Sequence, residues 1–237
     1  MSIIYLSTIQ YLNSLNDNVK KINLSNKKLN YLPNLSRFKK LKILNCNNNN
    51  LIFLPPLNNN LKVLHCDNNN LISLPELNSK LEDLNCSNNK LISLPVLNNK
   101  LKYLNCDNNN LTSLPSLNIS LTDLSCQHNK LTSLPPLNDK LIYLNCRYNL
   151  LIFLPPLNNS LKDLLCSFNY LSTLPNLTNN LHILFCCDNP INEIIGIITK
   201  ENIHKWNHFR EFYFLSKLRK KFIFWLWISR ETMNKNN

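Results

Sequence analysis

Glycine and alanine are nearly missing from this chain, whose 237 residues include one glycine, Gly196, and no alanine. A phosphate-binding loop needs several glycines, so the sequence contains no loop of that type. It also lacks an apolar run of the roughly 18 residues that a membrane span requires. No Cys-x-x-Cys pair occurs, and His65 and His128 have no recognisable nucleophile partner. We therefore expect no metal, no cofactor and no enzymatic activity.

The charge of the chain is unevenly placed. The formal net charge is +12, yet between Ile43 and Pro190 nine Lys and Arg residues balance nine Asp and Glu residues. The excess lies in residues 17–42, with eight basic side chains against Asp17, and in residues 191–237, with nine against four. A nucleic-acid-binding protein is expected to line its main surface with Lys and Arg. The neutral middle therefore predicts no specific nucleic-acid partner.

The chain has nine cysteines, which in a secreted protein would form a disulfide framework. Its first residues, MSIIYLSTIQYLNSLND, lack the charged and apolar regions of a signal peptide. We therefore expect an intracellular protein with reduced thiols.

A unit of twenty residues recurs along the chain. It reads Leu-x-x-Leu-x-Cys-x-x-Asn-x-Leu-x-x-Leu-Pro-x-Leu-Asn-x-x, as in LKILNCNNNNLIFLPPLNNN from Leu41. Units begin at every twentieth residue from Leu41 to Leu181, and a divergent first unit of 22 residues begins at Val19. Leucines and an asparagine at these fixed offsets are typical of a leucine-rich repeat solenoid.

Each unit is expected to contribute one short strand, because its start alternates with period two. Positions one, four and six should point inward and positions three and five to solvent, in a parallel, concave sheet with strands about 4.8 Å apart. The proline at position 15 predicts an extended, polyproline-like convex side with at most a 3₁₀ turn, and little or no helix before residue 190. The predicted fold is a β-rich horseshoe in residues 19–195, with residues 1–18 capping its start and a basic, aromatic, helical segment in 196–237.

Two ladders of identical residues follow from the period. The asparagines at position nine are expected to satisfy backbone groups where the chain leaves the strand. They are Asn49, Asn69, Asn89, Asn109, Asn129, Asn149, Asn169 and Asn189.

The cysteines at position six allow two interpretations, since neighbouring Cα atoms of such a stack lie within disulfide range. The inward position and the reducing compartment favour the other one, in which each thiol packs as a small buried hydrophobe. The ladder consists of Cys46, Cys66, Cys86, Cys106, Cys126, Cys146, Cys166 and Cys186.

Units such as LEDLNCSNNKLISLPVLNNK resemble the short leucine-rich repeats of bacterial type III secreted effectors, which usually have Val where this chain has Cys. Some of those effectors carry a ubiquitin-ligase domain with a catalytic cysteine, and no cysteine follows Gly196 here. The composition, rich in Asn and Ile, is similar to that of repeat proteins of giant DNA viruses of the Mimivirus type. The resemblance implies recognition of a protein partner, not ligase activity.

The concave strand face is the expected recognition surface, because solenoids of this kind bind there. Exposed aromatic residues with an arginine are typical interface anchors, and here they gather in the later repeats together with aspartates. Two alternatives are ordinary exposed strand residues and hydrogen bonds between phenols and carboxylates of neighbouring repeats. The predicted partner-binding residues are Tyr103, Asp123, Tyr143, Arg147, Tyr148, Asp163 and Phe168.

The last segment no longer follows the twenty-residue pattern and has apolar residues at helical spacing between Glu201 and Arg230. One hypothesis is an amphipathic helix that caps the last repeat. The others are contact with an anionic membrane surface, a partner or a second copy. The residues predicted for such a tail contact are Lys220, Lys221, Phe224, Trp225 and Trp227.

Two functions therefore stay open. The first is a non-enzymatic interaction module that binds a protein partner on its concave face, as a viral factor acting on host proteins in the host cytoplasm. The second is a structural, assembly or membrane-associated component, virion-associated if viral, that acts through the basic aromatic tail. Neither the partner nor the oligomeric state follows from the sequence.

Overall fold

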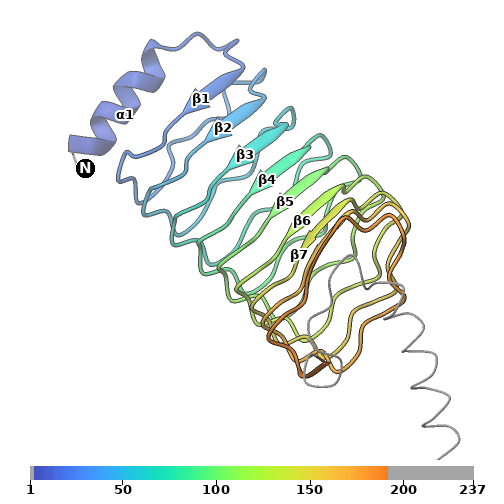
Figure 1. Cartoon of the computed structure of the whole chain (residues 1–237). Coiled ribbons are helices and arrows are strands. Elements are labelled where there is room, and N and C mark those ends of the chain that lie inside the picture. Colours follow the sequence, from blue (N-terminus) through green and yellow to red (C-terminus); the bar gives the residue numbers. More distant parts are fainter. Residues whose placement is uncertain (1–2, 192–237) are drawn as a thin grey trace, which may run out of the picture.

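The computed structural model describes residues 3–191 and shows one short helix followed by a solenoid of stacked strands (Figure 1). The strands pair in chain order, parallel and in register, so residues twenty apart are direct neighbours from the second repeat onward. The elements are α1 (Ile3–Ser14), β1 (Lys21–Asn23), β2 (Ile43–Asn45), β3 (Val63–His65), β4 (Asp83–Asn85), β5 (Tyr103–Asn105), β6 (Asp123–Ser125), β7 (Tyr143–Asn145), β8 (Asp163–Leu165) and β9 (Ile183–Phe185).

The predicted repeat fold is confirmed. Leucines at positions one, four and eleven lie in one continuous core, as at Leu101, Leu104 and Leu111, which are 2% exposed or less. Positions three and five face away from this core, but most of them are half-buried because each side chain is flanked by those of the neighbouring strands. The convex segments carry no helix or strand, and no 3₁₀ turn is found in residues 3–191.

The asparagine at position nine joins neighbouring repeats. Asn109 Nδ2 lies 3.1 Å from the carbonyl oxygen of Cys86 and 3.1 Å from that of Cys106, to which it donates. Its Oδ1 accepts the Leu91 N–H at 3.0 Å. The other seven ladder asparagines make the same kind of contact, so these amides replace the ladder partners that the backbone loses at the turn.

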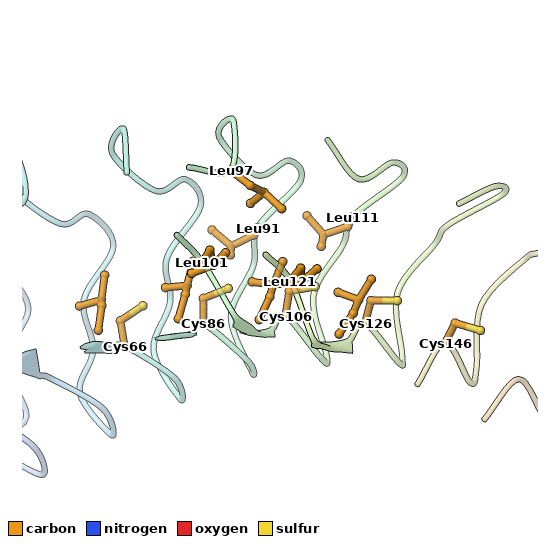
Figure 2. Close-up of a cluster of buried hydrophobic side chains, with 14 of the residues drawn as sticks. Cys66, Cys86, Leu91, Leu97, Leu101, Cys106, Leu111, Leu121, Cys126 and Cys146 are labelled. Carbon is orange, nitrogen blue, oxygen red and sulfur yellow. The ribbon is translucent and has the colours of Figure 1, made fainter. Parts of the chain in front are cut away.

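The eight cysteines at position six are buried in the same core as the leucines, and Figure 2 shows the part of this row from Cys66 to Cys146. All eight are free and buried, and Cys187 is free and exposed. Burial raises the pKa of Cys46, Cys86 and Cys146 to about 12. Each of these three thiols therefore stays protonated at neutral pH.

Little helix precedes residue 190, as predicted, but the helix α1 at Ile3–Ser14 was not itself predicted. Its Leu12 is 3% exposed and joins the core of the solenoid. The Arg37 guanidinium donates to the carbonyl oxygens of Leu12 and Leu15 and pairs with Asp17 at 2.6 Å. Periodicity missed this helix because packing on the first repeat stabilises it, while its own sequence is only weakly amphipathic.

The predicted C-terminal helix and boundary of residues 196–237 lie outside the described residues, as do Lys220, Lys221, Phe224, Trp225 and Trp227.

Candidate protein-binding face

Four of the predicted binding residues form one row across the sheet. Tyr103 of β5 pairs with Asp123 of β6, which pairs with Tyr143 of β7 and then with Asp163 of β8. Asp83 of β4 extends the row at its start. Carboxylates and phenols therefore alternate at position three over five strands. We call this set, Asp83, Tyr103, Asp123, Tyr143 and Asp163, the acid–phenol row.

The two tyrosines of the acid–phenol row differ in surroundings. Tyr103 is 50% exposed, whereas Tyr143 is half-buried and interacts with the side chain of Asn145. Desolvation by burial, followed by the negative charge of Asp107, raises the pKa of Tyr143, although the hydrogen bond from Asn145 acts against this. Asn145 is only 5% exposed, so Tyr143 and its neighbours cover part of the strand.

The alternative of phenol-to-carboxylate hydrogen bonds is not seen. In residues 3–191 no such bond joins members of the acid–phenol row; Asp123 accepts instead from the Thr122 hydroxyl at 2.6 Å. Asp83 has a basic neighbour outside the row, His65 of β3, whose Nε2 lies 3.5 Å from Asp83 Oδ2. The carboxylates of Asp123 and Asp163 have no Lys, Arg or His within the 4.0 Å of an ion pair in that part of the chain. Among residues 3–191, both carboxylates thus lack a partner of opposite charge.

A second row lies at position seven, just past the strands. Asp107 is 7% exposed and accepts hydrogen bonds from Ser125 Oγ at 2.7 Å and from Gln127 Nε2 at 3.1 Å. Burial raises the pKa of Asp107, and these hydrogen bonds oppose the rise. Two repeats beyond Asp107, the Arg147 guanidinium lies over the Phe185 ring, 4.9 Å from its centroid. The sequence analysis selected Arg147 but missed Asp107. The only signal for Asp107 was its acidic side chain at position seven, beside a turn that is buried.

The aromatic residues at position eight stack on the turn that follows each strand. The ring centroids of His128 and Tyr148 are 4.1 Å apart, and those of Tyr148 and Phe168 are 4.2 Å apart, with nearly parallel planes. All three are exposed and have positive φ between 51° and 58°. Asn occupies the same place in the earlier repeats, as at Asn68 and Asn108, and tolerates this conformation better.

The aromatic stack therefore carries a backbone cost of roughly 1–2 kcal/mol per residue for the left-handed conformation. Part of it is offset by the ring contacts, which contribute about 0.5–1.5 kcal/mol per pair. The structure thus separates the predicted residues by position. Tyr148 and Phe168 belong to the turn with His128, and Arg147 lies at position seven beside that turn. The remaining four, Tyr103, Asp123, Tyr143 and Asp163, belong to the strands.

No group of three or more His, Cys, Asp or Glu side chains in residues 3–191 has a metal-binding arrangement. In the same part of the chain, no helix has the length and apolarity needed to cross a membrane.

Solved structures share this architecture. YopM from Yersinia enterocolitica has a TM-score of 0.74 and 35% identity, covering 78% of this chain and 41% of YopM. YopM from Yersinia pestis, a leucine-rich effector protein, has a TM-score of 0.68 and 36% identity, covering 72% of this chain and 49% of its own. The leucine-rich repeat domain of a Shigella effector has a TM-score of 0.52 and 30% identity, covering 78% of this chain and 74% of that domain. This chain belongs to the leucine-rich repeat family.

Its repeats are of the kind found in these bacterial effectors. The leucine-rich repeat chain spans less than half the length of the two YopM chains it resembles. No protein-family model and no curated protein matches its sequence. None of the three structures compared above is viral, so the resemblance to giant DNA virus proteins stays a prediction.

Proposed function

We propose that this leucine-rich repeat chain is a non-enzymatic interaction module that binds a protein partner on its strand face. The acid–phenol row carries the proposal, because it combines accessible tyrosine rings with two carboxylates that lack an ion-pair partner among residues 3–191. The stack of His128, Tyr148 and Phe168 adds exposed aromatic surface beside this row. These three residues have a left-handed backbone conformation, which is energetically unfavourable for their residue types. Aromatic anchors of this kind dominate protein interfaces.

The setting of this function is proposed from the relatives. Two of the solved structures are described as effectors, from Yersinia pestis and Shigella. A comparable role for this chain is that of a factor, viral or bacterial, acting on proteins inside a host cell. The alternative role in assembly or at a membrane surface rests on the basic, aromatic composition of residues 191–237.

Exchanging Tyr143 for Val and Tyr148 for Asn together is expected to weaken capture of the partner from host lysate about tenfold or more. Both substitutions install residues that occupy the same positions in another repeat, Val63 and Asn68, so the fold should persist. Tyr170→Asn is the matched control, since Tyr170 is 58% exposed at position ten, where other repeats have Asn. Quantitative pull-down against immobilised wild-type chain measures the loss.

Truncation after Gly196 separates the two functions. Capture that survives truncation and is lost in the Tyr143→Val/Tyr148→Asn variant supports the strand face. Capture that disappears on truncation and is unchanged in the double variant would contradict the proposal in favour of the tail.

A further inference from the structure

The carboxylates of the acid–phenol row recur on every second strand. Asp83, Asp123 and Asp163 belong to β4, β6 and β8, with one tyrosine between each pair. Neighbouring strands of a sheet lie about 4.8 Å apart, so successive carboxylates of this row are about 9.6 Å apart along the solenoid. The row is therefore a regularly spaced line of negative charges that runs across the strands.

Few peptide conformations place side chains on one face at this interval. A polyproline II helix repeats every three residues with a rise of about 3.1 Å each, which gives about 9.3 Å. An extended strand repeats on one face at about 6.8 Å, and an α-helix at about 10.5 Å for seven residues. Over two intervals the polyproline II helix departs from the row by about 0.6 Å, the smallest mismatch of the three.

The charges beside the row leave the two later carboxylates open to a cationic partner. On the position-two side, Lys62 and Lys102 are engaged by the carboxylate of Glu82 between them. Lys162 also lies on this side, directly before Asp163 in the chain, but forms no ion pair with it. On the other side, position five is uncharged from Asn85 to Phe185. Among residues 3–191, no Lys, Arg or His pairs with the carboxylates of Asp123 and Asp163. A basic partner lying on the row could therefore pair with both.

We propose that the acid–phenol row binds a basic polyproline II segment with a Lys or Arg at every third residue. Each cation pairs with one of Asp83, Asp123 and Asp163. The rings of Tyr103 and Tyr143 fill the gaps between successive cations and contact the prolines, as aromatic grooves do in polyproline recognition. This inference rests on the proposed function and names the chemistry of the partner segment.

A synthetic peptide of three Lys-Pro-Pro triplets tests the spacing, and a peptide of the same composition with its lysines contiguous at one end is the control. Both have the same charge and the same proline content, so only the interval between cations differs. With the full chain at low salt, fluorescence anisotropy should show about fivefold tighter binding of the triplet peptide, as expected for a few exposed ion pairs.

Variants locate the contact. Asp123→Asn/Asp163→Asn is expected to abolish the preference for the triplet peptide, whereas Asp139→Asn, which removes an exposed charge at position 19, should preserve it. Equal binding of both peptides to the wild-type chain, or a preference that persists in the double variant, overturns the inference. If partner capture still depends on Tyr143 and Tyr148 in that case, the protein-binding function stands and only the polyproline segment is excluded.

Discussion

Replacing Asn109 with alanine is expected to lower the free energy of unfolding by about 2–5 kcal/mol, because it leaves the buried Leu91 N–H without an acceptor and removes hydrogen bonds to carbonyl oxygens of two repeats at once. The Leu91 N–H loses its acceptor, and the Cys86 carbonyl oxygen loses one of its two donors and keeps Asn89 Nδ2. Asn109 is 8% exposed, so water reaches these groups poorly. Urea denaturation followed by circular dichroism measures the change.

Asn99→Ala is the matched control for this prediction. Asn99 is an exposed asparagine at position 19 of the preceding unit, and surface substitutions of this kind usually change stability by about 0.5 kcal/mol or less. A loss for Asn109→Ala that does not exceed the loss for Asn99→Ala would show that the amide ladder contributes nothing specific to the stack.

A thiol reagent is expected to modify one cysteine rapidly in the native chain and the other eight only on unfolding. Cys187 is exposed, and the eight cysteines of the ladder are buried. The pKa of Cys86 rises from 9.0 to about 12 on burial, which makes its reactive thiolate about a thousandfold scarcer at neutral pH. Ellman titration with and without denaturant separates the two classes.

Cys187→Ser should remove the fast phase and leave the slow phase unchanged. Cys187 contacts Ser167, with Oγ and Sγ 3.1 Å apart, and its replacement by serine keeps a polar group there. A second fast thiol in the native wild-type chain, or a fast phase that survives Cys187→Ser, would contradict the buried ladder.

Repetition explains why so much of the solenoid follows from the sequence. A twenty-residue period with Cys at position six fixes the inward residues of every unit, and the observed register, such as Tyr103 opposite Asp123, reproduces the predicted strand order. The same argument predicts the position of each amide in the asparagine ladder. Local pattern suffices here because each repeat contacts mainly its neighbours.

Features that occur at one place in the stack could not be predicted from the repeat period. The helix α1 is stabilised by packing of Leu12 on the first repeat, a contact that no periodicity encodes. The stacking of His128 on Tyr148 requires the left-handed turn, which aromatic residues rarely adopt. The burial of Asn145 beside Tyr143 likewise depends on side-chain orientation, which spacing alone does not specify.

Site-specific photo-crosslinking tests the proposed binding face most directly. A benzophenone side chain placed at Tyr103, which is 50% exposed on the strand face, is compared with one at Ile92, which is 66% exposed beyond the turn on the convex side. In host lysate, the strand position is expected to yield a discrete protein adduct and the convex position none. An adduct from Ile92 alone would contradict binding at the acid–phenol row.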